Sequence, residues 1–175
     1  MTTEYLLNRE VGHVLAALMP SNQLVIQLCL HTGARLSDVL ELKTEQLKSR
    51  FWYTEKKTGK RRLMGIPRPL LDEIKRQSGE VWAFPGRDGK RHRTRQAVWK
   101  DVKRAAVAFR LPQNVGPHSF RKVYAVDLLQ KYGNIDKVRR NLNHGSNTVT
   151  AIYAMADVLL ATKCVKKPMR YGRRK

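Results

Sequence analysis

The chain has 175 residues, of which 42% are apolar, and this combination indicates one folded domain rather than a disordered chain. No run of about 18 apolar residues is present, so the sequence predicts no transmembrane helix. The first residues lack the basic and apolar stretches of a secretory signal. Cys29 and Cys164 form no CxxC pair, and buried thiols in a reducing cytoplasm are the simplest interpretation of both.

The charge is the unusual part of the composition. Lys and Arg number 35 against 14 Asp and Glu, which gives a net charge of +21 and a pI near 10.6. So large an excess causes self-repulsion in the folded state, and a polyanion is its usual complement. Nucleic acid is therefore the expected partner, although the generally basic surface of a structural protein would give the same composition.

The first half of the chain predicts three helices and then a hairpin. Residues 6–18 read as an amphipathic helix, and Ser21 or Asn22 can cap a second helix over residues 23–30 that stops at Gly33. A third helix is expected to begin near Arg35. The pattern then changes to two short strands, at residues 51–54 and 62–66, around a basic hairpin tip.

The second half predicts helices separated by Pro, Gly and polar loops. Pro67 and Pro69 lead into the first of these helices, and Thr94 is a suitable N-cap for the next. Helices are expected around residues 70–74, 94–109, 118–132 and 135–142, followed by one that begins near Ser146 or Asn147. The predicted fold class is α+β, mainly helical with one small antiparallel sheet.

Several polar residues stand in motifs whose combination suggests chemistry on a phosphodiester. They are Arg35 in Thr-Gly-Ala-Arg, Lys57 in Lys-Thr-Gly, His118 and Arg121 in His-Ser-Phe-Arg, His144, and Tyr153 nine residues later. Arginine, lysine and histidine suit the extra negative charge of a phosphoryl-transfer transition state, and a tyrosine can serve as a nucleophile.

These motifs resemble those of the tyrosine recombinase (phage integrase) family. The family pattern is Thr-Gly-x-Arg, a lysine on a β-hairpin, His-x-x-Arg, Leu-Gly-His and then a tyrosine. The intervals of 22 residues from Arg35 to Lys57, 23 from Arg121 to His144 and nine from His144 to Tyr153 match that pattern. The resemblance covers about residues 10–160 and implies the catalytic-domain fold of these DNA breaking-and-rejoining enzymes.

The resemblance implies a role for each residue. Arg35 and Arg121 would hold the scissile phosphate through their planar forks, and His144 would hydrogen-bond to the same group. His118 lies three residues before Arg121, so one helix face can offer both side chains to the site. Lys57 resembles the general acid that protonates the leaving 5′ oxygen. A lysine can do this when neighbouring positive charge lowers the pKa of its ammonium group. Asp38 matches the acidic position that supports these basic groups.

Tyr153 would attack phosphorus and form a 3′-phosphotyrosyl bond. Because that bond keeps the energy of the phosphodiester, rejoining would need no ATP, and cationic side chains would serve in place of a metal. No cofactor is therefore expected.

Taken singly, each residue has a simpler interpretation. Lys57 has close competitors in Lys56 and Lys60, since all three suit a solvated hairpin tip. Of the six tyrosines only Tyr153 has the required spacing, while Tyr124 and Tyr132 lie in an apolar helix and are expected in the core.

The sequence departs from the family pattern at the turn before His144, at the residue after Arg121 and in its domain content. Asn143 replaces the usual glycine and tolerates a left-handed backbone better than most residues, while Lys122 stands where many relatives have histidine. Residues 1–162 are expected to form a single catalytic domain and residues 163–175 a basic tail, without the N-terminal core-binding domain of most relatives. Either a natural single-domain recombinase or a truncated catalytic domain fits this length.

The expected partner is double-stranded DNA, contacted by the basic loop at residues 90–93 and the helix after it. Lys60, Arg93, Arg95 and Lys100 are the candidate contacts. The sequence thus predicts a cytoplasmic, bacterial or phage-encoded site-specific recombinase that acts as a tetramer on paired sites, with an accessory DNA-binding protein as a further candidate partner. A type IB topoisomerase-like activity and a catalytically silent DNA-binding regulator are the alternatives. Target sequence and reaction outcome are not encoded in these motifs.

Overall fold

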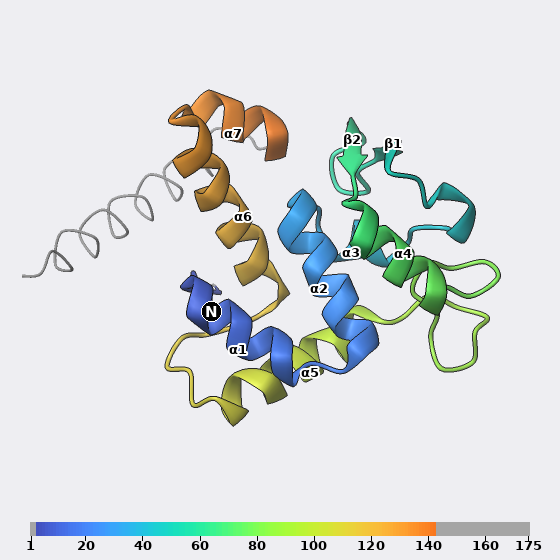
Figure 1. Ribbon diagram of the computed structural model, residues 1–175, viewed down its shortest axis with the longest axis horizontal. Helices are drawn as coiled ribbons and strands as arrows, with labels where there is room; N and C mark the ends of the chain where they lie inside the picture. Colours follow the sequence, from blue (N-terminus) through green and yellow to red (C-terminus); the bar gives the residue numbers. More distant parts are fainter. Residues whose placement is uncertain (1–2, 143–175) are drawn as a thin grey trace, which may run out of the picture.

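The computed structural model describes residues 3–142, apart from the side chains of residues 135 and 139. Within that range the fold is mainly helical with one two-stranded antiparallel sheet, as the sequence predicts (Figure 1). The elements in chain order are α1 (Asn8–Ala17), α2 (Pro20–Thr32), α3 (Leu36–Leu40), the 3-10 turn η1 (Thr44–Gln46), β1 (Arg50–Thr54), β2 (Arg61–Gly65), α4 (Arg68–Gln77), α5 (Arg95–Ala108), α6 (Pro117–Tyr132) and α7 (Ile135–Leu142).

Helix α2 is the centre of the core. It packs against α1, α3, α4 and α6, and its apolar residues Val25, Ile26 and Leu28 are fully buried. The expected cap at Ser21 or Asn22 is wrong, because Pro20 takes the first helical position and Met19 is the N-cap. Proline suits that position since its fixed φ is helical and its missing N–H would have no partner there.

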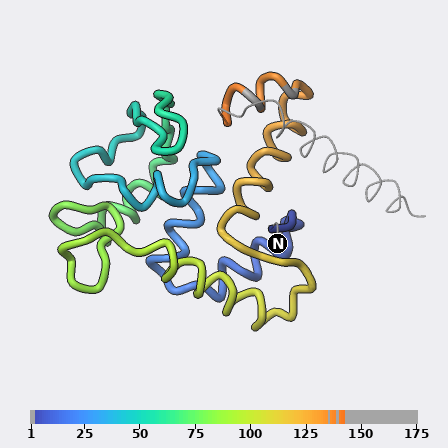
Figure 2. Tube along the Cα trace, turned by 180° about the vertical axis from the view of Figure 1, so that it is seen from behind, coloured from blue at the N-terminus to red at the C-terminus, as the bar shows by residue number. Residues whose placement is uncertain are grey.

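The hairpin confirms the predicted strands to within one residue. Trp52 pairs with Leu63 and Tyr53 with Arg62, so that Tyr53 and Met64 are buried. Trp52 and Leu63 are exposed. The C-terminal end of α2 lies between this hairpin and α6 in both views (Figures 1 and 2).

Helices α5, α6 and α7 begin and end close to the residues expected. The Thr94 hydroxyl accepts a hydrogen bond from the Ala97 amide at 3.1 Å, as predicted for an N-cap, and Gly133 ends α6 in the left-handed conformation. Val138 and Leu142 of α7 form a small second core against Ala125 of α6.

The two tyrosines of α6 differ in burial. Tyr124 is half-buried and packs against this second core, whereas Tyr132 is 40% exposed, so its expected place in the core is wrong. The reason is position, because Tyr132 is the last residue of α6 and its ring lies 3.8 Å from the ammonium of Lys137 rather than over apolar neighbours.

No helix among residues 3–142 combines the length and apolar character that crossing a bilayer requires.

Candidate active site

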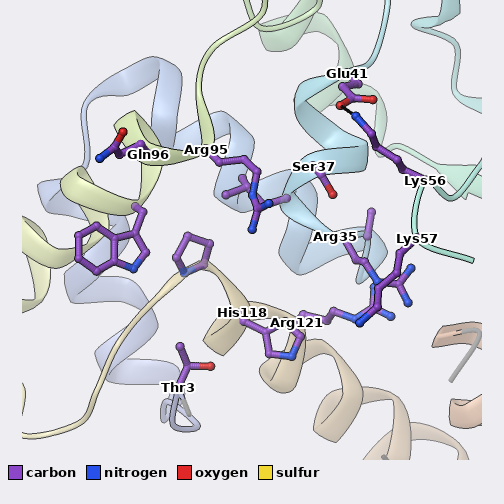
Figure 3. Close-up of a pocket in the computed structure, with 14 residues that line it drawn as sticks. Thr3, Arg35, Ser37, Glu41, Lys56, Lys57, Arg95, Gln96, His118 and Arg121 are labelled. Carbon is purple, nitrogen blue, oxygen red and sulfur yellow. Dashed lines mark hydrogen bonds and ion pairs between the residues drawn. The ribbon is translucent and has the colours of Figure 1, made fainter. Parts of the chain in front are cut away.

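Four of the predicted catalytic residues line one pocket of about 810 Å³. Arg35 comes from the start of α3, Lys57 from the hairpin turn, and His118 and Arg121 from the first two turns of α6. Figure 3 shows their side chains meeting on one side of the pocket. The remaining lining residues are Thr3, Ala34, Leu36, Ser37, Glu41, Lys56, Arg95, Gln96, Trp99 and Pro117. His144 and Tyr153 lie outside the described residues.

The Thr-Gly-Ala-Arg motif is a helix end that places Arg35. Gly33 ends α2 with a φ of +62°, and its amide bonds to the Cys29 carbonyl at 2.8 Å. An added Cβ at Gly33 would lie 2.2 Å from the ring of Tyr124, so glycine is required both by the backbone and by this approach. Arg35 follows as the N-cap of α3.

Arg121 is held by backbone carbonyls from two separate elements. Its Nη1 donates to the Gly33 carbonyl and its Nη2 to the Leu142 carbonyl at 2.8 Å, and only 2% of the residue is exposed. Burial, followed by the nearby charges of Arg35 and Arg62, lowers the pKa of Arg121 to about 10. Arg121 therefore remains charged near neutral pH in a fixed orientation.

Arg35 is oriented by two buried carboxylates. Its Nη1 lies 2.7 Å from Glu55 Oε2 and 4.0 Å from Asp38 Oδ2. Asp38, the predicted supporting acid, also accepts from the Lys56 amide at 3.1 Å. Burial raises the pKa of the Asp38 carboxyl, whereas hydrogen bonds from Arg35 and Thr58 outweigh the burial of Glu55 and lower its pKa.

The hairpin turn favours Lys57 over its two competitors. Lys57 and Lys56 line the pocket, whereas Lys60 does not. The ammonium of Lys56 pairs with Glu41 at 2.5 Å. Lys57 is thus the lysine of this turn that reaches the pocket without an acidic partner among residues 3–142.

His118 lies at the pocket surface among positive charges. Desolvation by the pocket walls, followed by the charges of Arg121 and Lys122, lowers the pKa of its imidazole below the ordinary 6.5, and Arg35 and Lys57 act in the same direction. The imidazole is therefore neutral near pH 7 and can accept a proton.

The pocket has two walls. The first carries Arg35, Lys57, His118 and Arg121, and the second is the start of α5. Arg95, Gln96 and Trp99 line it and are exposed, Trp99 by 48%. Lys100 is exposed on the same helix. Arg93 differs, because its Nη1 donates to Asn22 Oδ1 at 3.0 Å and burial lowers its pKa.

Sequence reasoning missed Glu55, Arg62 and Trp99. Glu55 is an acid in a basic hairpin, which was the available signal, but only the fold brings it under Arg35. Arg62 reads as one basic residue of many, yet its guanidinium donates to the Thr32 and Gly33 carbonyls. Nothing in the local sequence distinguishes Trp99 from a core tryptophan.

The fold and this set of residues define the class of the protein. The structure aligns with a TM-score of 0.70 to the XerH site-specific recombinase bound to its palindromic difH substrate in a post-cleavage complex, at 22% identity over 85% of this chain and 48% of XerH. The fold is therefore that of tyrosine recombinase catalytic domains. Residues 4–158 match the family described as the phage integrase family. The chain belongs to that family.

The relatives are integrases and recombinases. The chain is 30% identical over 173 residues to the integrase of Escherichia phage P2, which covers 97% of this chain and 48% of that protein. It is 29% identical over 151 residues to the tyrosine recombinase XerD of Mycobacterium tuberculosis, covering 78% of this chain and 48% of XerD. The chain thus spans about half the length of these relatives.

Proposed function

We propose that the chain is the catalytic part of a site-specific DNA recombinase that cuts and rejoins strands through a 3′-phosphotyrosyl bond on Tyr153. The observation that carries this proposal is the meeting of Arg35, Lys57, His118 and Arg121 in one pocket. Four basic side chains from three distant segments converge there, as a dianionic phosphorane-like transition state requires.

The two arginines supply the phosphate site. The guanidinium of Arg121 is already fixed by two carbonyls and that of Arg35 by a carboxylate, so little reorganisation is needed when a phosphate enters. Donors fixed in advance and partly withdrawn from water stabilise developing charge more strongly than mobile ones.

The proton transfers follow from the positions of His118 and Lys57. Neutral His118 accepts the phenol proton while Tyr153 Oη attacks phosphorus, and the bond from phosphorus to the 5′ oxygen breaks. Lys57 donates a proton to that oxygen, so a 3′-phosphotyrosyl bond and a free 5′ hydroxyl result. Rejoining reverses each step and uses neither ATP nor a metal ion. His144 is assigned a second hydrogen bond to the same phosphate.

Double-stranded DNA is the proposed substrate. XerH, of the same fold, carries DNA in its described complex, and the net charge of +21 fits such a partner. Arg95 and Lys100 are proposed as contacts beside the scissile phosphate, Lys60 as a contact from the hairpin, and Arg93 as a contact at the loop. Recombination on paired sites would require a tetramer, with an accessory DNA-binding protein as a further proposed partner.

Covalent trapping tests the proposal. Nicked duplex fragments of the replicon that carries the gene would be incubated with the protein, and adducts that resist SDS would be separated by electrophoresis. We expect an adduct with the wild type, none with Tyr153→Phe, and an undiminished one with Tyr132→Phe, which removes a hydroxyl from an exposed tyrosine.

Three outcomes have distinct meanings. An adduct that survives Tyr153→Phe would contradict the nucleophile. Adduct formation with relaxation of supercoiled plasmid, but without exchange between paired sites, would indicate the topoisomerase-like alternative. DNA binding without any adduct would indicate the silent regulator.

A further inference from the structure

Glu55 is the most deeply buried charged residue of the hairpin, and it lies between Arg35 and the turn that carries Lys57. It is 0% exposed, and its carboxylate contacts Arg35 at 2.7 Å and Thr58 Oγ1 at 2.8 Å on Oε2, with Arg62 at 3.6 Å on Oε1. A carboxylate is rarely buried unless it is paired, and this one has partners on β2, on the turn and at the start of α3.

The backbone of Glu55 also closes the turn that carries Lys57. Its amide donates to the Lys60 carbonyl at 3.0 Å, and its carbonyl accepts from the Gly59 amide at 2.8 Å. Lys57 lies inside this closed turn, one residue before Thr58. The side chain of Glu55 thus joins the turn to Arg35, while its main chain determines the shape of the turn.

The charges around Glu55 explain why an acid is needed there. Arg35, Arg62 and Arg121 lie together, and the nearby charges of Arg35 and Arg62 each lower the pKa of Arg121. Without Glu55, Arg35 would keep among the described residues only the more distant Asp38 carboxylate, at 4.0 Å, to oppose its repulsion from Arg121. Glu55 offsets that repulsion at the side of Arg35 that faces the hairpin.

We propose that Glu55 is a positioning residue that fixes the separation between the phosphate-binding Arg35 and the proton-donating Lys57. One carboxylate oxygen holds both the Arg35 guanidinium and the Thr58 hydroxyl, so the two groups cannot move independently. The inference rests on the proposed function, since it assigns Glu55 to the geometry of that reaction.

Two variants separate this coupling from a simple structural role. Glu55→Gln keeps the shape but loses the charge that holds Arg35. Thr58→Val keeps that charge but removes the hydroxyl that links Glu55 to the turn, together with its longer 3.4 Å bond from the Lys60 amide. Asp72→Asn, at an exposed position of α4, changes the net charge by the same amount as Glu55→Gln and serves as the control. We expect adduct formation to slow about 10- to 100-fold in Glu55→Gln, with DNA affinity equal to that of the control, because small misplacements of catalytic groups have effects of that size.

A substrate with sulfur in place of the scissile 5′ oxygen identifies which group has moved. A thiolate leaves without protonation. This substrate therefore restores a cleavage rate that was lost because Lys57 moved, but it does not restore a rate that was lost because Arg35 moved. Thr58→Val should be restored nearly fully, Glu55→Gln only in part, and Arg35→Lys not at all. Full restoration of Glu55→Gln, or none, would overturn the coupling, and so would an unchanged rate on the ordinary substrate.

A measurement without catalysis keeps this inference apart from the proposed function. In ¹⁵N–¹H spectra, Glu55→Gln should shift both the Arg35 Nε–H signal and the Lys57 amide, and Thr58→Val should shift the Lys57 amide alone. An Arg35 signal that stays in place in Glu55→Gln would overturn the inference even if no adduct ever formed. Absence of any adduct with the wild type, alongside the expected shifts, would count against the proposed function only. Unfolding curves of both variants show whether the fold is retained.

Discussion

The two walls of the pocket differ in how their basic side chains are held. On the first wall, Arg35 and Arg121 are oriented by a carboxylate and by backbone carbonyls, and Arg121 is 2% exposed. On the second wall, Arg95 and Gln96 of α5 are exposed and have no hydrogen-bonded side-chain partner among residues 3–142. Fixed, desolvated cations act strongly on charge that develops at one point, whereas exposed cations adapt to a surface and are screened by salt. The first wall therefore suits chemistry and the second suits binding.

The largest expected effect comes from the first wall. Arg121→Lys should lower the cleavage rate about 10²- to 10³-fold, because a single ammonium cannot bond to two carbonyls and still offer a fork to phosphate. DNA affinity, measured by fluorescence anisotropy, should change little. Arg95→Lys on the second wall is the matched control and should leave the cleavage rate nearly unchanged. Equal losses of cleavage and affinity in Arg121→Lys would make Arg121 an anchor for DNA only.

The backbone beneath the first wall gives the next largest effect. Gly33→Ala should lower the free energy of unfolding by more than the roughly 1–2 kcal/mol of left-handed strain, because the new Cβ also meets Tyr124 at 2.2 Å. Gly133→Ala is the control, since Gly133 ends α6 with a φ of +61° and an added Cβ there would have no atom of the described residues within 4 Å. Urea unfolding of both variants measures the difference. Equal losses would mean that the Tyr124 ring moves aside at no cost.

The same contrast explains how far the sequence could predict the molecule. Helices α5, α6 and α7 could be predicted from local signals, such as the Thr94 N-cap and the Gly133 C-cap. The hairpin could be predicted from its two short strand-like segments. The catalytic motifs were recognisable because their order and spacing resemble a family pattern. That Arg35 and Lys57 line one pocket with Arg121 depends on long-range contacts at the end of α2, where α6 packs against α2 and Arg62 of the hairpin bonds to the Thr32 carbonyl, and no local pattern contains these contacts.

Residues that support others were the hardest to predict. Glu55 and Arg62 act through buried contacts made across the chain, and neither has a spacing signal of its own. The start of α2 differs from the expectation for a local reason, because Pro20 follows the predicted helix at residues 6–18 and is nevertheless the first residue of the next helix. Proline allows both interpretations, and only the position of the following apolar residues decides between them.

The second wall predicts a smaller effect, on binding rather than cleavage. Arg95→Ala should weaken DNA binding a few-fold and reduce the slope of log affinity against log salt by about one, as expected for the loss of one phosphate contact. Arg93→Ala is the comparison, because the Arg93 guanidinium is bonded to Asn22. It should lower the free energy of unfolding, and it should reduce the salt slope by less than Arg95→Ala does. Binding titrations at several salt concentrations measure both variants. An equal fall in slope for Arg93→Ala would show that the bond to Asn22 does not weaken the phosphate contact of Arg93 relative to that of Arg95.

The smallest expected effect is on the pKa of the His118 imidazole, which desolvation and the positive charges of the first wall lower. His118 has a lowered pKa because of desolvation and then the positive charges around it, among which Lys57 acts least. Lys57→Met removes one of those charges, so the pKa of His118 should rise toward 6.5, as measured by NMR titration of the imidazole protons. Because the folded-state pKa lies below the unfolded one, His118 makes the fold less stable as pH falls from the unfolded value through the folded one. Lys57→Met should narrow the pH range between the folded and unfolded pKa values of His118, over which stability is lost. Lys100→Met on the second wall should leave that range unchanged. A titration of His118 that is identical in Lys57→Met and the wild type would mean that the ammonium of Lys57 points away from the phosphate site.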